Sequence, residues 1–205
     1  MACSIVHLPH VTVGRIEKCG CKSGGVLESA GVLPHYPPEE TGYYTRRGLW
    51  VDQACAIIAQ GKQLSEHTIW QGELNRIKPM SKLESTERWI DYVHQFGFWM
   101  RLHEIIFDAA QQPVMLVDDG VVGTYDLMLQ VDGYLAIIDI KCGSIPPATR
   151  LQTAIYNIGT GMRAFKRLGL LLLPNKFEEH WYSDDVDYND ARILMRAYHI
   201  KGKYA

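Results

Sequence analysis

Three residues that could do chemistry, Asp126, Asp139 and Lys141, lie close together in an otherwise apolar part of the sequence. Alternate side chains of a β-strand share a face, so Asp139 and Lys141 are expected to point the same way at a strand end. Two carboxylates and a backbone carbonyl, here that of Ile140, suit a hard divalent cation such as Mg²⁺ or Mn²⁺. Such a cation polarises a phosphoryl oxygen and lowers the pKa of a bound water, and a nearby lysine can neutralise charge developing on a phosphate. The pattern therefore indicates hydrolysis of a phosphate ester.

The simpler alternative is that Asp139 and Lys141 form an ordinary ion pair at the end of a strand. A bare Asp-x-Lys tripeptide is common, which favours that interpretation. Asp139, however, lies within the apolar run "LAIIDIK", where an unpaired carboxylate is costly to bury. The apolar surroundings therefore favour a functional role.

The elements that must position these residues follow from the spacing of apolar residues. Helices are predicted over residues 46–61, 85–108, 146–169 and 188–201. Strands are predicted over residues 114–119, 121–131, 134–141, 170–174 and 177–183, with a turn at Asp132-Gly133 joining the second and third. This order predicts an α/β fold with a mixed β-sheet flanked by α-helices. We expect one domain over residues 1–205, with an irregular N-terminal segment at 1–45 and the core at 46–205.

Two of these helices carry clear apolar stripes. The stripe of the helix over 85–108 comprises Trp89, Val93, Phe96, Met100 and His103. The stripe of the helix over 146–169 comprises Leu151, Ile155, Ile158, Met162 and Phe165. Ser81 and Glu84 could form a capping box if the first of these helices starts early.

Composition limits the class of protein. The chain has 205 residues, 47% of them hydrophobic, and a formal net charge of −2, so it is globular and not basic overall. A nucleic-acid partner would need a local basic patch. The start "MACSIVHLPH" does not resemble a signal peptide, no apolar run could span a bilayer, and the five cysteines are an odd number. We therefore expect a cytoplasmic protein without a membrane partner.

The cysteines and histidines near the start could in principle hold zinc. They are Cys3, His7, His10, Cys19 and Cys21. Their spacing fits no common zinc module, so free thiols in a loop are the better interpretation.

Four sequence features in order resemble the PD-(D/E)xK nuclease superfamily, and more narrowly its RecB-like and phage-type exonucleases. They are Gly123-Thr124-Tyr125-Asp126, the Asp139-Ile140-Lys141 strand, Gly143 after it, and the pair Gln152 and Tyr156. Weaker likenesses occur in "LPHVTVGRI", "RRGLWVDQA" and "ERWIDYVHQF". The resemblance implies a restriction-endonuclease-like core and a DNA nuclease that depends on Mg²⁺ or Mn²⁺. It assigns catalysis to Asp126, Asp139 and Lys141, with Gln111 as a fourth candidate. It assigns the metal to Asp52, Asp126, Asp139 and the Ile140 carbonyl.

Two positions depart from the family pattern. Asp52 takes the place of a histidine that ligates metal in RecB-like relatives; an aspartate can also ligate Mg²⁺, or Asp52 is simply a solvated helix residue. Gln111 takes the place of a glutamate and cannot supply negative charge, although it could hold a metal-bound water. Glu104 could substitute for that glutamate in space. Because Asp126, Asp139 and Lys141 are intact, an active nuclease is favoured over a silent one.

Several residues are candidates for contacts with DNA. In the family, the glutamine and tyrosine that match Gln152 and Tyr156 position the site or the DNA backbone, and they stand one helical turn apart. Tyr156 could instead be a half-buried core residue. Candidates for phosphate contacts are Arg46, Arg47, Arg150 and Arg163, which could equally be solvated surface residues. Candidates for stacking on bases are Tyr43, Tyr44 and Trp50, which could equally be packing residues.

The function expected from these observations is a metal-dependent DNA exonuclease in phage-type recombination or processing. No helix-turn-helix or zinc finger is present in the sequence, which favours an enzyme that reads the DNA backbone. The alternatives are a catalytically silent DNA-binding or interaction module on the same fold, and a structure-selective endonuclease. Besides DNA, the resemblance allows a single-strand annealing or single-strand binding protein as a partner, and a homo-oligomer.

Overall fold

The computed structural model describes residues 6–7, 38–64, 88–116, 121–183 and 185–204. Its strands are β1 (Val6–His7), β2 (Ile105–Leu116), β3 (Val121–Val131), β4 (Tyr134–Cys142), β5 (Lys166–Leu172) and β6 (Phe177–Tyr182). Its helices are α2 (Pro38–Ala59), α4 (Trp89–Leu102), α5 (Thr149–Gly159) and α6 (Val186–Tyr204).

The described strands form one mixed sheet. Its order is β1-β3-β4-β5-β6, and β2 also pairs with β3. The pairs β2–β3, β3–β4 and β5–β6 are antiparallel, whereas β4–β5 and β1–β3 are parallel. The parallel pair β4–β5 is joined through α5, because parallel neighbours need a crossover connection. The predicted α/β fold with a mixed sheet is thus confirmed.

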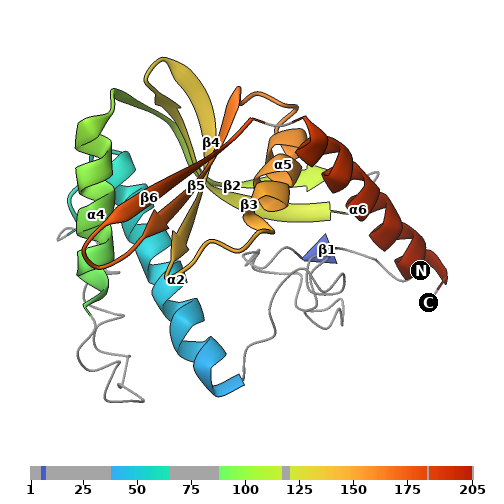
Figure 1. Cartoon of the computed structure of the whole chain (residues 1–205), viewed down its shortest axis with the longest axis horizontal. Helices are drawn as coiled ribbons and strands as arrows, with labels where there is room; N and C mark the ends of the chain where they lie inside the picture. The colour runs from blue at the N-terminus through green and yellow to red at the C-terminus, as the bar shows by residue number, and fades with distance from the viewer. Residues whose placement is uncertain (1–5, 8–37, 65–87, 117–120, 184, 205) are drawn as a thin grey trace.

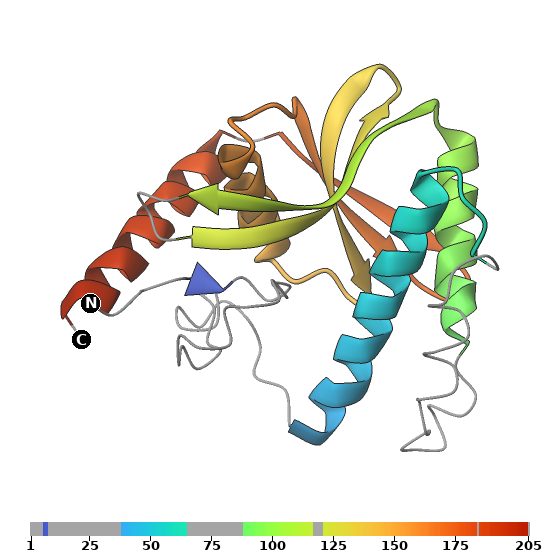
Figure 2. The ribbon, with the colours of Figure 1, turned by 180° about the vertical axis from the view of Figure 1, so that it is seen from behind.

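Helices cover both faces of this sheet, as Figures 1 and 2 show from opposite sides. On one face, α2 and α4 pack against Ile138 and Ile140 of β4, both at most 3% exposed. On the other face, α5 and α6 pack against Ile137 of β4 in a second apolar cluster. Burying one such isoleucine stabilises the fold by about 1.5–3 kcal/mol. Strand β4 is therefore apolar on both faces, and charged residues within it need specific partners.

The predicted turn between β3 and β4 is present. Asp132 has φ 49° and Gly133 has φ 84°. Consecutive positive φ values are typical of the tight turns that match strand twist, and Asp-Gly adopts them readily. This turn sets the register that brings β3 and β4 together.

The helix predicted over 146–169 is wrong in its second half. Helix α5 ends at Gly159, and a turn with positive φ at Gly161 and Met162 follows. The side chain of Asn157 stabilises that turn, because its Nδ2 donates to Ala164 O and its Oδ1 accepts from Ala164 N, both at 3.0 Å. Met162 (46% exposed) and Phe165 (82% exposed) are therefore not core residues, and β5 begins already at Lys166.

Two further boundaries differ from the prediction. The helix predicted over 85–108 ends at Leu102, and the next strand begins at Ile105 rather than at Val114, because β2 pairs with β3 along its length. Within that helix Trp89, Val93 and Phe96 are buried as predicted, Met100 is half-buried, and His103 lies just after the end.

The helix predicted over residues 46–61 starts earlier, because α2 runs over Pro38–Ala59. Three other predictions fall outside the described residues: the "LPHVTVGRI" likeness, the Ser81–Glu84 capping box, and the zinc alternative apart from the backbone of His7.

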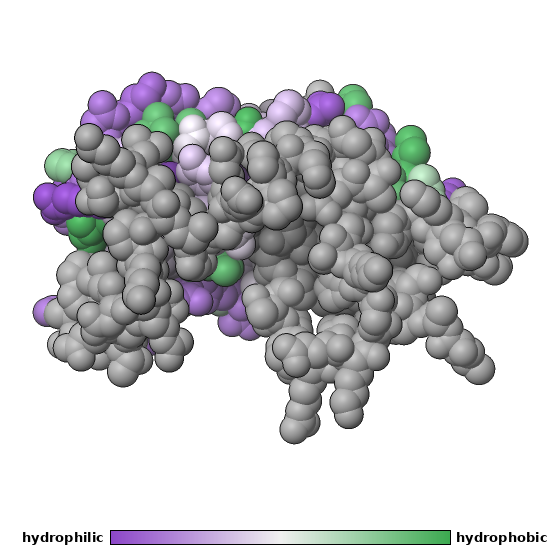
Figure 3. Space-filling view, turned by 90° about the horizontal axis from the view of Figure 1, so that it is seen from below, coloured by the Kyte–Doolittle hydropathy of each residue, from purple (hydrophilic) through white to green (hydrophobic). Residues whose placement is uncertain are grey.

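No helix in the described ranges is both long enough and apolar enough to cross a membrane. Seen from below, the coloured surface mixes hydrophilic and hydrophobic residues (Figure 3).

A buried ion network attaches α6 to the sheet. Arg167 of β5 places Nη2 2.8 Å from Asp187 Oδ2, and these two side chains are 1% and 3% exposed. Arg150 of α5 lies 3.1 Å from the other oxygen of Asp187. The carboxylate of Asp187 thus joins three elements.

We expect Asp187→Ala to lower the free energy of unfolding by about 3 kcal/mol, because it removes a buried carboxylate that is paired with the buried Arg167 guanidinium. Urea denaturation measures this loss. Asp190→Ala on the same helix is the matched control and should change stability by less than about 1 kcal/mol. An equally small loss in Asp187→Ala would mean that the network does not hold α6.

Candidate active site

The site begins where β3 and β4 separate. Their paired residues run from Val131 and Tyr134 to Leu127 and Ile138, so the next pair in register would be Asp126 and Asp139. At that point the Asp126 side chain takes the place of the strand partner, and its Oδ2 accepts a hydrogen bond from Ile140 N at 2.7 Å. Residues directly opposite in an antiparallel pair share a face. The opening between the strands therefore brings Asp126 and Asp139 to one place, as the sequence predicted.

Lys141 completes this group from the end of β4. Its Nζ lies 2.6 Å from Asp139 Oδ2, and its side chain is 13% exposed. The same Nζ donates to Gln152 Oε1 of α5 at 3.2 Å. An ion pair between Asp139 and Lys141 is thus present, but it belongs to a larger polar cluster that runs into the protein.

Gln152 and Tyr156 support Lys141 from behind. The Nε2 of Gln152 donates to the Tyr156 hydroxyl at 2.9 Å, and the two residues are 3% and 1% exposed. Tyr156 is therefore not a half-buried residue with its hydroxyl in water. Gln152 contacts the lysine and Tyr156 holds Gln152, and neither side chain is exposed at the molecular surface.

Asp52 joins the cluster from α2. It is 7% exposed, so the alternative of a solvated helix residue is wrong. Burial raises the pKa of Asp52 well above its ordinary value, and the negative charge of Asp126 raises it further, whereas Lys141 opposes the rise. Asp52 is therefore close enough to the aspartates of the sheet for their charges to interact.

The pKa values of Asp126, Asp139 and Lys141 depend on burial and on the charges of one another. Burial, then the negative charge of Asp139, raises the pKa of Asp126 to about 7 despite Lys141 and the Ile140 amide. Burial also raises the pKa of Asp139, although Lys141 opposes it. Burial alone would lower the pKa of Lys141, but the surrounding carboxylates outweigh it and raise that pKa. The cluster therefore has more carboxylates than its single lysine can balance when all of them are ionised.

The donor chemistry of this cluster fits a hard divalent cation. Two buried oxygens, Asp52 Oδ1 and Asp139 Oδ1, have no hydrogen-bond partner among the described residues. Unpaired buried carboxylate oxygens are costly, and carboxylates are the ligands that Mg²⁺ prefers.

The three carboxylates are not, however, arranged as a finished set of ligands. Within the described ranges, no three His, Cys, Asp or Glu side chains stand in such an arrangement. Asp126 is turned to the Ile140 amide and Asp139 to Lys141 instead. At Ile140 the amide contacts Asp126, whereas the sequence predicted a role for the carbonyl.

Gln111 and Glu104 are the two residues considered for the position of a glutamate in the nuclease pattern. The structure places neither of them in the carboxylate cluster. Gln111 falls in β2 between residues that pair with Leu127 and Tyr125, so its place in the register is opposite Asp126. Its φ is 49° and its side chain is exposed, so it does not extend this buried cluster. Glu104 lies beside the Asp132 turn, where its amide donates to Asp132 Oδ1 at 2.9 Å. Six residues of strand, roughly 20 Å, separate that turn from Asp126, so Glu104 does not substitute.

The arginines proposed as phosphate contacts do not gather at the site. Arg47 is buried, with both of its Nη atoms donating hydrogen bonds inside the protein. Arg150 pairs with Asp187, and exposed Arg163 lies 3.4 Å from Asp108. The side chain of Arg46 lies outside the described residues.

The aromatic residues proposed to stack on bases differ in their exposure. Trp50 is 3% exposed and its ring centroid lies 6.0 Å from that of Trp89, so it is a packing residue. Tyr44 is 42% exposed and close to Arg47. The side chain of Tyr43 lies outside the described residues.

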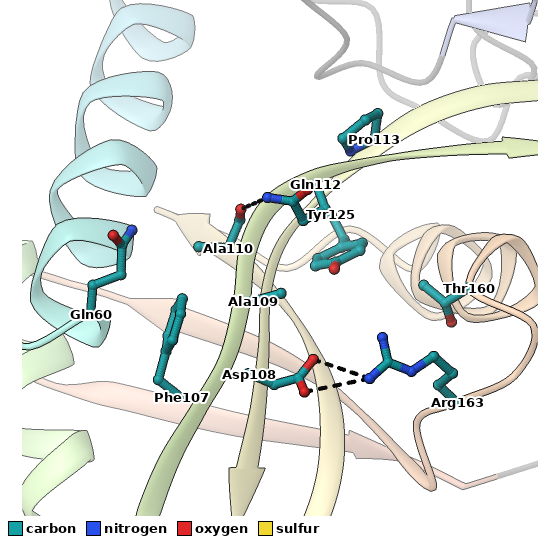
Figure 4. Close-up of a pocket in the computed structure, with 10 residues that line it drawn as sticks. All are labelled: Gln60, Phe107, Asp108, Ala109, Ala110, Gln112, Pro113, Tyr125, Thr160 and Arg163. Atoms are coloured by element: carbon teal, nitrogen blue, oxygen red, sulfur yellow. Dashed lines mark hydrogen bonds and ion pairs between the residues drawn. The ribbon is translucent and has the colours of Figure 1, made fainter.

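An open groove of about 730 Å³ runs beside β2 (Figure 4). Its polar lining includes Asp108, Tyr125 and Arg163, and none of the four clustered residues Asp52, Asp126, Asp139 and Lys141 lines it. The groove is therefore not the site described above.

Comparison with known proteins gives little guidance. No family model matches the chain. No curated protein matches it either. One solved structure that matches is described as "Crystal structure of SSO0001"; its sequence identity is 13%, it covers 74% of this chain and 73% of that chain, and its TM-score is 0.34. A similarity at this level carries no argument about fold or function.

Proposed function

We propose that this chain is a metal-dependent deoxyribonuclease of the PD-(D/E)xK type, with a restriction-endonuclease-like core. The observation that carries the proposal is the meeting of Asp126, Asp139 and Lys141 where β3 and β4 separate. A buried third carboxylate, Asp52, interacts with them. Acidic residues and a lysine in this order suit hydrolysis of a phosphodiester with Mg²⁺ or Mn²⁺.

Each residue of the cluster has a definite task under this proposal. Asp52, Asp126 and Asp139 would hold the cation, which when bound activates a water and withdraws charge from the phosphate. Lys141 is charged at neutral pH because the carboxylates raise its pKa. It therefore supplies positive charge and hydrogen bonds to the phosphate or the water, and it does not act as the base. Gln152 holds the ammonium in place through its Oε1.

The proposed reaction is exonucleolytic, in phage-type recombination or processing. The test is incubation of linear and covalently closed circular DNA with Mg²⁺ or Mn²⁺. We expect loss of linear DNA only. Cutting of both substrates would instead identify an endonuclease. A Lys141→Ala protein purified in the same way controls for contaminating nucleases.

A catalytically silent DNA-binding module is the second candidate. Two observations favour it: Gln111 is exposed and uncharged, and the described carboxylates do not form a finished set of ligands. Binding of DNA without cleavage of either substrate, in either metal, would establish this candidate and overturn the nuclease proposal.

Asp52→Asn should raise the Mg²⁺ concentration needed for half-maximal cleavage by about tenfold, because a third carboxylate strengthens the attraction for the cation. Asp52→His should recover part of this loss and shift the preference toward Mn²⁺, since imidazole is a softer ligand. Metal titrations of cleavage with both variants measure the effect. An unchanged Mg²⁺ requirement in Asp52→Asn would remove Asp52 from the site.

A further inference from the structure

The buried side chain of Arg47 joins α2 to two other elements. It is 6% exposed, and its Nη1 donates to the Tyr92 hydroxyl of α4 at 3.1 Å. Its Nη2 donates to the carbonyl of Cys142, also at 3.1 Å. The guanidinium carbon also lies 5.0 Å from the ring centroids of Tyr44 and Tyr92. Arg47 is thus fixed by its aromatic neighbours while it holds a backbone atom of β4.

The carbonyl that Arg47 holds belongs to the residue directly after Lys141. On one side, this end of β4 is paired with β5, where Cys142 lies opposite Leu172. On the other side, the pairing with β3 stops at Ile138. Arg47 therefore supports the strand end just beyond the point where its second strand partner has separated. Without a second support, a strand end is free to fray.

Gly143 provides the room that this contact needs. Its φ is 98°, a conformation that other residues rarely adopt. A Cβ at this position would lie 3.1 Å from Arg47 Nη2, closer than ordinary van der Waals contact. Glycine therefore allows the guanidinium to lie against the chain as β4 ends.

We propose that Arg47 is a positioning residue, which fixes the end of β4 and so holds Lys141 and Asp139 in place for the reaction. The inference rests on the proposed function. It replaces the expectation from the sequence that Arg47 contacts a DNA phosphate, because a guanidinium committed to Tyr92 and Cys142 has no exposed face to offer. Arg47 does not touch the reacting atoms and acts only through the backbone.

The decisive variant is Arg47→Lys. Lysine keeps the positive charge but lacks the planar fork that reaches two acceptors at once. We expect kcat to fall by about 10- to 100-fold, since small misplacements of catalytic groups have effects of this size. KM for DNA should stay within about twofold. A phosphate contact would behave in the opposite way, with a raised KM and little change in kcat.

Hydrogen exchange of the backbone tests the positioning role without any activity. In Arg47→Lys, amides of residues 140–144 should exchange at least about tenfold faster, while those in the centre of β5 keep their wild-type rates. Arg101→Lys on α4, where the exposed arginine lies over the Phe98 ring, is the matched control and should change neither kcat nor exchange. Wild-type exchange at residues 140–144 in Arg47→Lys would overturn the proposal.

Tyr92→Phe gives a second, milder test in case Arg47→Lys does not fold. It removes one acceptor of the guanidinium and keeps the ring, so kcat and exchange should move in the same directions by about two- to tenfold. A change in exchange without any cleavage by the wild-type protein would leave Arg47 as a structural clamp and reject the nuclease function. Cleavage together with unchanged exchange and kcat in both variants would reject only the role of Arg47.

Discussion

Lys141→Ala should lower the rate of DNA cleavage by at least about 1,000-fold and leave DNA binding within about threefold of wild type. The Lys141 ammonium lies 2.6 Å from Asp139 Oδ2 and is held by Gln152, and among the described residues it is the cation that lowers the pKa of Asp139. A positive charge that acts mainly in the transition state contributes to kcat more than to binding. Single-turnover cleavage and a DNA-binding titration, each with Mg²⁺ present, separate the two quantities.

The matched control for this variant is Lys166→Ala. Lys166 lies on the neighbouring strand, with its Nζ 3.9 Å from the centroid of the Tyr134 ring, and makes no described contact with the carboxylate cluster. Its loss should leave cleavage within about twofold of wild type. Circular dichroism of both variants excludes unfolding as the cause. Wild-type turnover in Lys141→Ala would reduce Lys141 to the partner of a structural ion pair.

Local sequence was sufficient to predict the strands that carry the central residues. The apolar runs of β3 and β4 and the Asp132-Gly133 turn depend on neighbours in the chain, so apolar composition and turn chemistry specify them. Once those strands are paired, Asp126 and Asp139 follow as opposite residues. The central part of the site was therefore predictable before its surroundings were known.

Other features depend on contacts between distant parts of the chain. The apolar spacing of residues 146–169 is that of one continuous helix. In the structure, however, the Asn157 side chain closes a turn by its hydrogen bond with Ala164, and β5 then pairs with β4. Likewise, pairing with β3 converts residues 105–108 into strand. Tertiary pairing of this kind overrides local propensity.

The burial of Arg47 and Asp52 could not be predicted from local sequence for the same reason, and only the family resemblance pointed to a role for Asp52. Both lie on α2, where charged residues normally face water. The structure places them against the open end of β4, where Arg47 finds the Cys142 carbonyl and Asp52 meets the other carboxylates. Nothing in the amino acids around them signals that burial. Gly143 gave a partial signal, because a glycine directly after a strand often marks a positive φ or a close contact.

Asp126→Asn should make the metal-free protein more stable than wild type above pH 7 while removing its cleavage activity. The pKa of Asp126 is raised to about 7 in the folded protein, compared with 3.8 for an ordinary aspartate. The folded state therefore binds more protons than the unfolded state between these two values, and stability falls as the pH rises through that window. The loss is complete above pH 7 and amounts to at most about 4 kcal/mol. Asparagine carries no charge and can still accept the hydrogen bond from the Ile140 amide.

The measurement is the melting temperature from pH 4 to pH 8 in EDTA, for wild type and for Asp126→Asn. The two proteins should be about equally stable near pH 4, where the aspartate is protonated, and the variant should gain on wild type up to about pH 7. Asp52 and Asp139, whose pKa values are also raised, should leave a weaker slope of the same sign in the variant. Adding Mg²⁺ should stabilise wild type at pH 8 and reduce the difference, since a cation that binds only the folded state stabilises it by mass action. Equal melting temperatures at pH 8 in EDTA would mean that neither burial nor the neighbouring carboxylates disfavour the charged form of Asp126, and the strongest physical reason for a cation at this site would then be lost.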